Sequence, residues 1–480
     1  MELHRRIRSA PAGFGAVRAE FDLPTGYPDA AVTEARDAID AFAGLRRDRT
    51  DLAFVTIDPP GAMDLDQAVH LTRGATGFTL HYAIADVAAV VRPDGALAAE
   101  TRSRGQTYYL PDGTVPLHPP VLSEGAASLL PDVDRPVALW TVELDEHAAP
   151  RSYRVERALI RSRARLDYAG VQAAADAGTL PAAIAGLPEF GALRIEAGLE
   201  RGAIALRLPA QSVVADDGVS GHWKLELEPR TAADDWNEQV LLLVGMCAAR
   251  IMLDSPEPVG LLRTMPAPPD SAVAAMRRTA AALGVAWPAE QPVGRMLAGL
   301  DPNTPAGLVL NSEATTLLRG AAYTVFGVGA EPAAPPADPD HSGLGAPYAH
   351  VTAPLRRLSD RFTTEICLAR CAGTDIPDWV HTGLTEAANA MKRSDSVANK
   401  VDRACVDLTE AALLAPRIGA EFDAVVLREA AGAKPAEIFV ADPPILAPCT
   451  GEPPEGARVG VRLIVADPAA RQVRFGYPAP

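Results

Sequence analysis

Residues 51–70, with the sequence DLAFVTIDPPGAMDLDQAVH, restrict the possible folds of this chain more than any other stretch. Two short apolar runs, Ala53–Ile57 and Ala68–Leu71, are predicted to be strands, and the Pro-Pro-Gly turn between them reverses the chain. Residues two apart on a strand point to the same side. The turn should therefore bring three carboxylates together at one end of a sheet: Asp58, Asp64 and Asp66.

Three acidic side chains at one strand junction repel one another unless a cation offsets their charge. Carboxylate oxygens are hard ligands that suit Mg2+ or Mn2+, the ions that phosphoryl chemistry uses. The alternative is an acidic, solvated loop, because Asp is common in turns. This stretch alone leaves both interpretations open.

Length and composition indicate a globular protein with more than one domain. At 480 residues the chain is too long for one ordinary core, and it is 48% hydrophobic and 22% charged. The net charge of −16 argues against sequence-blind coating of nucleic acid, although it leaves room for a local basic channel. The five cysteines show no metal-ligand or disulfide spacing, which fits a reducing cytoplasm.

The start of the chain is basic, but no apolar segment of a signal peptide follows it. The longest apolar run, Val240–Ala249, is about half as long as a membrane span and is predicted to be part of a buried helix. We therefore expect a cytoplasmic monomer with no membrane association and no organic cofactor.

The predicted elements give an α+β fold in three parts. Residues 1–50 form a lead-in with one amphipathic helix, Ala31–Leu45. Residues 51–415 form a large domain with a mixed sheet surrounded by helices, and its Pro- and Gly-rich segment 105–136 is predicted to be a long functional loop. Residues 420–480 are short β runs that fit a shortened, OB-like barrel. The other elements predicted in the large domain are the strands Phe78–Val91, Ala138–Leu144 and Ser152–Ile160, and the helices Tyr168–Asp176, Asp234–Leu253, Ser271–Leu283, Pro354–Ala369 and Thr382–Leu414.

The predicted helix from Pro354 carries basic side chains that a phosphate would attract. With Thr352 as its N-cap, the buried stripe leaves Arg356 and Arg357 on other faces. Arginine makes planar, bidentate contacts with phosphate. The alternative is a solvated helix face, on which Arg356 pairs with Asp360 at i,i+4.

Aromatic residues make up only 5% of the chain, so their positions carry information. Tyr108 and Tyr109 are adjacent and should point to opposite sides, so that one can enter the core while the other stacks on a base. Core packing is the alternative for each tyrosine, including Tyr168. Glu238, near the start of an apolar helix, is either a favourable charge at a helix N-terminus or a residue that faces the cation site.

Three long motifs together resemble the RNB catalytic domain of the ribonuclease II family of 3′-to-5′ exoribonucleases. They are TIDPPGAMDLDQA, YYLPDGTVPLHPPVLSEGAASLLPDVDRP and YAHVTAPLRR, and they occur in the expected order within residues 51–415. The resemblance implies that Asp58, Asp64 and Asp66 bind metal and take part in catalysis, and that Arg356 holds the scissile phosphate. It also implies that Tyr109 contacts the RNA 3′ end and that Tyr168 stacks on the terminal base. The remaining residues that it assigns to RNA binding are Glu238, Arg357 and Asp402, and it implies that the closing β segment is an S1-like RNA-binding barrel.

Two features depart from the family pattern. Gln67 stands where the family usually has a fourth aspartate. Its amide oxygen can ligate a metal but supplies no charge, so one metal position should be weak or differently occupied. We expect no cold-shock barrels before the catalytic domain, where the family usually has two, because fifty residues cannot hold them, and RNA should then enter through a more open mouth.

The resemblance implies a hydrolase that removes nucleotides one at a time from the 3′ end of single-stranded RNA, releases 5′-monophosphates and requires Mg2+ or Mn2+. One competing hypothesis is an RNA-binding protein whose catalytic domain has lost its chemistry through Gln67. Another is a small-molecule phosphodiesterase without an RNA channel. The retained aspartates, Arg356 and both tyrosines favour the enzyme, because a drifting pseudo-enzyme would have little reason to keep the whole set.

Overall fold

The computed structural model describes residues 10–206, 211–216, 221–227, 230–302 and 304–478. Its largest part is built on a six-stranded sheet with the strand order β2-β9-β3-β4-β5-β8. These strands are β2 (Arg47–Asp48), β3 (Phe54–Ile57), β4 (Gln67–Gly74), β5 (Gly77–Ala85), β8 (Asp134–Leu144) and β9 (Pro150–Leu166). β9 is long enough to pair with β8 along most of its length and with β3 near its end, so the sheet closes on itself. Both faces of its central strands are buried, which explains their nearly continuous apolar sequences.

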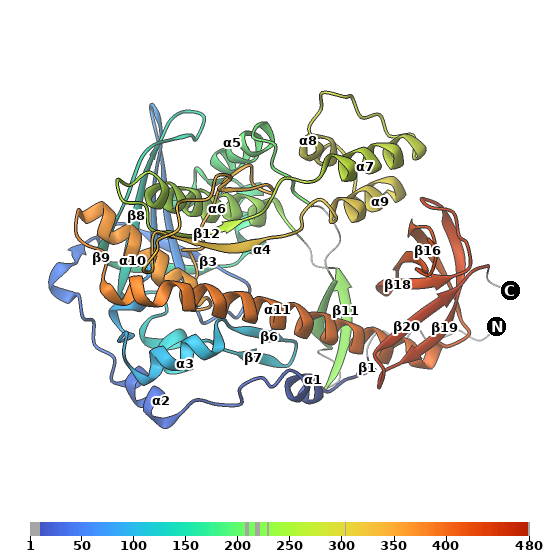
Figure 1. The fold of residues 1–480 in the computed structure, drawn as a ribbon, viewed down its shortest axis with the longest axis horizontal. Coiled ribbons are helices and arrows are strands. Elements are labelled where there is room, and N and C mark those ends of the chain that lie inside the picture. Colours follow the sequence, from blue (N-terminus) through green and yellow to red (C-terminus); the bar gives the residue numbers. More distant parts are fainter. Residues whose placement is uncertain (1–9, 207–210, 217–220, 228–229, 303, 479–480) are drawn as a thin grey trace.

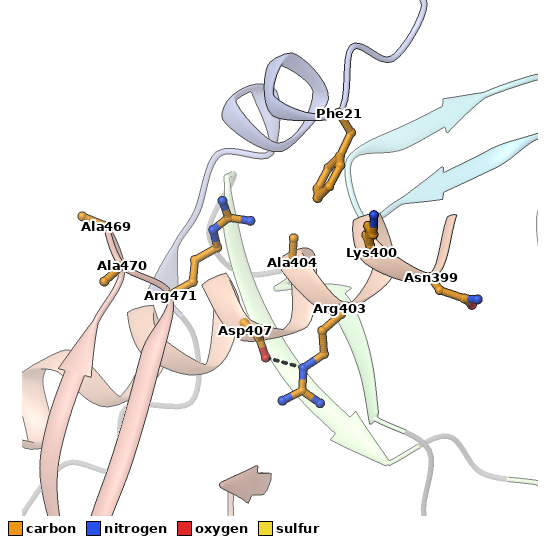
Figure 2. A pocket seen from close by; sticks show the side chains of 9 residues that line it. All are labelled: Phe21, Asn399, Lys400, Arg403, Ala404, Asp407, Ala469, Ala470 and Arg471. Atoms are coloured by element: carbon orange, nitrogen blue, oxygen red, sulfur yellow. Dashed lines mark ion pairs between the residues drawn. The ribbon is translucent and has the colours of Figure 1, made fainter. Parts of the chain in front are cut away.

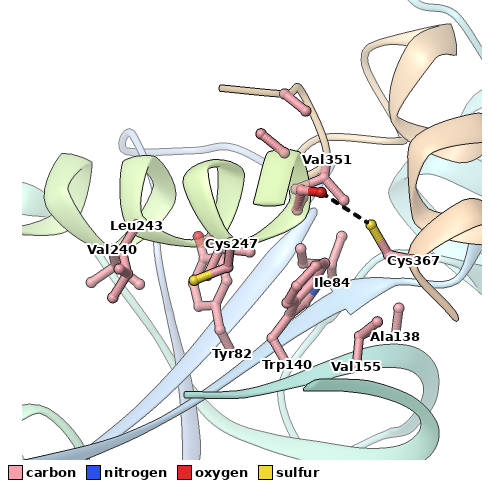
Figure 3. Close-up of a cluster of buried hydrophobic side chains, with 14 of the residues drawn as sticks. Tyr82, Ile84, Ala138, Trp140, Val155, Val240, Leu243, Cys247, Val351 and Cys367 are labelled. Atoms are coloured by element: carbon pink, nitrogen blue, oxygen red, sulfur yellow. Dashed lines mark hydrogen bonds between the residues drawn. The ribbon is translucent and has the colours of Figure 1, made fainter. Parts of the chain in front are cut away.

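Helices pack against this sheet and form the main core (Figure 1). The central ones are α5 (Leu187–Glu200), α6 (Ala232–Leu253) and α10 (Leu358–Ala372). Figure 3 shows Tyr82 and Trp140 rising from the strands toward α6, where they lie under Leu243 and Cys247. Within the described residues, α6 is the one helix long and apolar enough to cross a membrane, but half of its most apolar window is buried in the protein, as in a core helix.

The long helix α11 (Asp378–Leu414) runs from the main body to a small β-barrel (Figure 1). The barrel is closed in the order β16-β17-β18-β20-β19. Its strands are β16 (Glu421–Arg428), β17 (Ala436–Ala441), β18 (Pro444–Thr450), β19 (Arg458–Asp467) and β20 (Gln472–Gly476). Leu413 and Leu414 of α11 belong to the barrel's own core, so the last turn of the helix fixes the barrel to the body.

Smaller elements complete the fold. The remaining helices are α1 (Gly15–Glu20), α2 (Asp29–Arg36), α3 (Ala96–Arg104), α4 (Tyr168–Asp176), α7 (Asp270–Ala282), α8 (Val293–Ala298) and α9 (Pro305–Ala314). The remaining strands are β1 (Ala10–Pro11), β6 (Tyr108–Leu110), β7 (Gly113–Val115), β10 (Gln211–Ala215), β11 (His222–Leu227), β12 (Gly260–Thr264), β13 (Ala322–Phe326), β14 (Asp340–His341) and β15 (Ala346–Pro347). Figure 2 shows a shallow hollow where α1, α11 and the β19–β20 turn meet. Arg471 from this turn pairs with Glu20, and Arg403 pairs with Asp407 at 2.8 Å, so these arginines join or brace elements of the fold.

The structure confirms the predicted α+β class and the closed C-terminal barrel. The predicted helix Ala31–Leu45 was wrong, because α2 ends at Arg36. Asp40 instead accepts the backbone N–H of Phe42 at 2.9 Å and pairs with Arg46, which holds the following residues in a loop. Residues 1–9 and 479–480 of the predicted lead-in and barrel lie outside the described residues.

Two other predicted elements differ from the structure. The strand predicted over Phe78–Val91 ends at Ala85, and a short 3-10 turn, Val87–Ala89, follows it. The loop predicted over residues 105–136 contains the β6–β7 hairpin and one π-helical turn, Leu122–Ala126. Short paired segments of three residues carry too little periodicity to be found from the sequence.

Candidate functional site

Asp58 ends β3 at the edge of the sheet, where the sequence predicted a carboxylate. Its backbone N–H donates to the Leu166 carbonyl at 3.0 Å, which ties this position to the end of β9. In the turn that follows, Gly61 adopts a φ of +83°, a conformation that favours glycine. The side chain is only 5% exposed, and within the described residues no hydrogen-bond partner reaches its Oδ2 atom. Burial raises the pKa of Asp58 to about 6, against the opposing charge of Arg356.

Asp64 and Asp66 lie in the segment that leads into β4, which begins at Gln67 and not before. Leu65 between them enters the core, and its N–H donates to the Ser128 hydroxyl at 3.0 Å. The charge of Asp64 acts on both Asp58 and Asp66, so Asp64 lies near each of them. Within the described part of the chain, however, no three acidic, His or Cys side chains converge closely enough to form a ready metal-binding group.

Asp66 is fully buried and already has two partners. Its Oδ1 accepts the N–H of Leu355 at 2.7 Å, and its Oδ2 accepts Nε of Arg356 at 2.6 Å. Burial raises the pKa of Asp66, and the nearby guanidinium opposes that rise. This buried ion pair explains why Asp66 does not turn toward Asp58 to complete a three-carboxylate group.

Arg356 lies in a turn that precedes α10, and not in the helix itself as predicted. The helix begins at Leu358, because the N–H of Leu358 donates to Gly105 at 2.9 Å and the Asp360 carboxylate accepts the N–H of Ala353 at 2.7 Å. Thr352 is therefore not its N-cap. The guanidinium of Arg356 lies among Asp66, Tyr109 and Asp64, which raise its pKa although burial alone would lower it.

Arg357 has a different environment from its neighbour. It pairs with the buried Asp360 at 2.7 Å, so the alternative interpretation, in which Asp360 pairs with Arg356 on a solvated helix face, does not hold. The guanidinium of Arg357 is bound to the Asp360 carboxylate, and no contact of the structure tests whether it also binds RNA. The assignment of Arg357 to RNA binding therefore remains a prediction.

The β6–β7 hairpin brings Tyr109 beside Arg356. Tyr108 is 6% exposed and packs in the core, whereas Tyr109 is 53% exposed, so the two adjacent tyrosines do point to opposite sides. The hairpin is tied to the Arg356 turn, since the N–H of Thr107 donates to the Arg356 carbonyl at 2.9 Å. At its other end, Arg18 of α1 pairs with Asp112 at 2.7 Å. Tyr109 and Arg356 are therefore held in a fixed relation to each other.

Tyr168 begins α4 directly after β9, with Asp167 as the N-cap that accepts the Gly170 N–H at 2.7 Å. Because the carbonyl of Leu166 binds the Asp58 N–H, Tyr168 is only two residues from this anchor. The charge of Asp58 acts on the Tyr168 hydroxyl, whose pKa is raised by burial and by that charge. The structure thus brings Tyr168 to the carboxylate cluster.

The other predicted site residues have different neighbours. Glu238 on α6 pairs with Arg230. Asp402 is exposed on α11, and its negative charge acts on the thiol of Cys405. No contact among the described residues joins Asp402 to the three carboxylates, so its assignment to RNA binding remains a prediction.

Gln67, the departure from the family pattern, is nearly buried, and its Oε1 accepts the hydroxyl of Tyr82. Tyr82 was missed by the sequence analysis, because it lies in an apolar strand, HYAIA, and resembles a core residue.

Two parts of the chain match known domain families. Residues 46–368 match the RNB domain, and residues 420–477 match the RNase II-type exonuclease C-terminal S1 domain. The chain belongs to the RNB family. This membership agrees with the resemblance carried by the three sequence motifs.

Known relatives of this RNB protein include ribonuclease R of Chlamydia trachomatis serovar D, which is 26% identical over 428 residues. The matched region covers 86% of this chain but 59% of the relative, so the chain spans less than two thirds of that protein's length. The solved structure of Mycoplasma genitalium RNase R in complex with ribose methylated single-stranded RNA has a TM-score of 0.84 at 19% identity, and covers 96% of this chain and 77% of that chain. Yeast Ssd1, a pseudonuclease, has a TM-score of 0.63 at 16% identity, and covers 84% of this chain and 50% of that chain. At these identities the two structures establish the fold of this RNB protein and nothing about its chemistry.

The residues of the site fit a divalent cation. Asp58 supplies a buried oxygen without a hydrogen-bond partner among the described residues, and Asp64 supplies a second, partly exposed carboxylate next to it. Hard oxygen donors of this kind are the ligands that Mg2+ and Mn2+ take. Asp66 is a third donor only if its contact with Arg356 loosens.

Proposed function

We propose that this RNB protein is a hydrolytic 3′-to-5′ exoribonuclease that degrades single-stranded RNA to 5′-nucleoside monophosphates with Mg2+ or Mn2+. The strongest support is the carboxylate pair formed by the buried Asp58 and the partly exposed Asp64, which lies beside Arg356 and Tyr109 at one edge of the sheet. An acidic pair next to a fixed guanidinium suits a phosphodiester, since the cation and the arginine together offset the charge of the phosphate.

Asp58 and Asp64 would hold the divalent ion, and Asp66 would join them when its contact with Arg356 loosens. The ion, when bound, supplies an activated water and offsets charge on the leaving oxygen. The chain itself supplies the position of these ligands: the end of β9 fixes Asp58 through its backbone, and Ser128 fixes the segment that carries Asp64.

Arg356 would bind the scissile phosphate and stabilise the charge that grows on it. Asp66 binds its Nε atom, and the terminal nitrogens of the guanidinium, which lies beside Tyr109, would contact phosphate oxygens. Since Asp66 is fully buried and also bound to Leu355, it holds the guanidinium in one orientation before the substrate arrives. Asp66 would thus act on the reaction largely as a positioning residue for Arg356.

Tyr109 and Tyr168 would bind the last bases of the strand. The exposed ring of Tyr109 can stack on a base, and stacking is tolerant of sequence because every base has a π face. The hairpin contact between Thr107 and Arg356 keeps the stacking surface at a constant distance from the phosphate site. Each removal of one nucleotide would therefore place the next phosphate in the same position.

A second candidate function is RNA binding without cleavage. Gln67 favours it, because the site has one carboxylate fewer than the family pattern and the amide oxygen is already bound by Tyr82. The fold alone does not decide between the two, because a pseudonuclease shares it.

A gel assay with 5′-labelled single-stranded RNA tests the proposal. Wild type, Asp58→Asn, Asp66→Asn and Gln67→Asp are each incubated with Mg2+, with Mn2+ and with EDTA. Asp51→Asn is the matched control, since Asp51 lies in the same stretch but its side chain is 72% exposed. We expect a ladder that shortens from the 3′ end, is abolished by EDTA and by the Asp58 and Asp66 changes, and is unaffected by Asp51→Asn. A wild type that binds RNA and leaves it intact, while Gln67→Asp cleaves it, would favour the second candidate.

A further inference from the structure

Gln67 and Tyr82 form a buried polar pair at the edge of the carboxylate cluster. In the β4–β5 register Tyr82 lies opposite Val69, so Gln67, two residues earlier on the same face, is its diagonal neighbour. The ring of Tyr82 is packed under α6 (Figure 3), and its hydroxyl donates to Oε1 of Gln67. A buried phenol hydroxyl needs a partner, and Gln67 supplies it.

The charges around this pair determine which way the amide faces. The carboxylates of Asp58 and Asp66 both act on the Tyr82 hydroxyl, so the pair lies within their field. A negative field favours the N–H end of an amide and disfavours its oxygen. The amide oxygen of Gln67 is occupied by the hydroxyl hydrogen of Tyr82, so the N–H end of the amide is the end left for another partner.

We propose that Gln67 is a hydrogen-bond donor toward a phosphate oxygen of the last RNA linkage and not a ligand of the divalent ion, and that Tyr82 is the positioning residue that fixes this orientation. The inference rests on the proposed function for its substrate. An amide N–H cannot bind a cation, but it can bind a non-bridging phosphate oxygen. The substitution of a carboxylate by Gln67 thus exchanges a metal ligand for a contact with the substrate.

The pair also predicts that replacement of Gln67 alone with aspartate destabilises the fold. Aspartate is one methylene shorter than glutamine, so its oxygen would draw back from Tyr82 and leave a buried hydroxyl without its partner. It would also add a buried negative charge beside Asp58 and Asp66. Changes at both positions avoid the first problem, because removal of both partners of a buried hydrogen bond is nearly neutral.

The test separates metal binding from phosphate binding with three variants of the full chain: Gln67→Met, Tyr82→Phe and the double variant. Methionine has the length of glutamine but no amide, and the double variant leaves no unpaired hydroxyl, so it remains informative if Gln67→Met is unstable. Tyr153→Phe is the control, since Tyr153 is also packed against the main core but lies on β9, away from Gln67. Circular dichroism and thermal melting verify that each variant is folded.

Two quantities are measured for each variant. Mn2+ affinity without RNA is measured by electron paramagnetic resonance. RNA affinity is measured in EDTA by fluorescence anisotropy with two single-stranded RNA probes. Both carry a 2′-O-methyl group at the last linkage. That linkage is an ordinary phosphate in one probe and a methylphosphonate in the other. The methylphosphonate lacks one charged phosphate oxygen.

We expect Gln67→Met and the double variant to weaken binding of the phosphate probe about tenfold, as the loss of a hydrogen bond to a charged group does. Binding of the methylphosphonate probe and of Mn2+ should change less than twofold. Tyr82→Phe should also weaken binding of the phosphate probe, but by a smaller factor. Tyr153→Phe should leave the binding of both probes and of Mn2+ unchanged. A tenfold loss of Mn2+ affinity in Gln67→Met, an equal loss on both RNA probes, or no loss on either would overturn the proposal.

Because these measurements need no cleavage, they can be distinguished from a failure of the proposed function. A wild type that shows the expected probe difference but yields no product with Mg2+ or Mn2+ refutes the exoribonuclease and supports the role of Gln67. A wild type that cleaves RNA while Gln67→Met binds both probes normally refutes only the role of Gln67. A wild type that binds neither probe overturns both.

Discussion

Replacement of Arg356 with methionine tests the ion pair on which the proposed site depends. Asp66 is fully buried, and in this variant its carboxylate keeps the Leu355 N–H but loses its counter-ion. Removal of one partner from a buried ion pair typically costs about 3–5 kcal/mol. We expect about 3 kcal/mol, the lower end of that range, because the Arg356 side chain is 31% exposed and water can enter the space that it leaves.

The sign of the pH dependence follows from the raised pKa of Asp66. In the variant this pKa lies still higher above its unfolded value of about 3.9, because the guanidinium no longer opposes the effect of burial. The folded variant therefore binds a proton more readily than its unfolded chain. Compared with the wild type, the variant therefore loses the most unfolding free energy above the pKa that Asp66 has in the folded variant. This loss becomes smaller as the pH falls toward the pKa of Asp66 in the unfolded chain.

The assay is urea unfolding of metal-free protein, followed by tryptophan fluorescence at pH 8 and pH 5. The double variant Asp66→Asn/Arg356→Met is the control, since it removes the charge that is left unpaired and should recover most of the lost stability. If Arg356→Met unfolds at the wild-type urea concentration at pH 8, or if its loss is the same at both pH values, then Asp66 is not the desolvated partner of Arg356 and the proposed positioning role is refuted.

Three further predictions concern single side chains. In metal-free protein, Asp58→Asn should have a higher unfolding free energy than the wild type at pH 8, by up to roughly 3 kcal/mol, because the pKa of Asp58 in the folded protein, about 6, exceeds its unfolded value. This advantage should disappear toward pH 4. Urea unfolding at several pH values tests the prediction, and a difference that does not change with pH contradicts it. Asp360→Asn should show the opposite trend, since Arg357 lowers the pKa of Asp360: the wild type should be more stable at pH 7, and its advantage should shrink as the pH falls below about 4. Tyr109→Ala should weaken the binding of single-stranded RNA in EDTA by about 1–3 kcal/mol, whereas Tyr109→Phe should stay near the wild type, and equal losses in both would exclude a stacking role.

The sequence was sufficient to place the centre of the site. A strand that ends in Asp58 and a Pro-Pro-Gly turn needed only local geometry, and Asp64 does lie near Asp58, although Asp64 and Asp66 precede β4 and do not alternate on a strand. The opposite orientation of Tyr108 and Tyr109 also followed from their adjacency, although the strand that carries them was predicted to be a loop. Periodicity and turn chemistry act within a few residues, so they determine features of this kind.

The partners of Arg356 and Arg357 were beyond the reach of the sequence. The i,i+4 rule paired Arg356 with Asp360, but that rule holds only inside a helix, and the helix begins after both arginines. Its start is determined by the Gly105 carbonyl, more than two hundred residues earlier in the chain. Arg356 then pairs with Asp66, which is 290 positions away, while Arg357 takes the local carboxylate. Tertiary hydrogen bonds therefore decide which of two adjacent, chemically identical side chains faces the site.

The charges at the site also explain how the fold accommodates Asp58, Asp64 and Asp66. Arg356 offsets the charge of Asp66, and the raised pKa of Asp58 means that it carries part of a proton near pH 6. Asp64 is partly exposed, so water screens it. A fourth carboxylate at position 67 would have none of these compensations, because the space is buried and its polar neighbour is the Tyr82 hydroxyl. The neutral amide at this position adds no charge to the carboxylates, which agrees with the proposed role of Gln67 as a donor to the substrate.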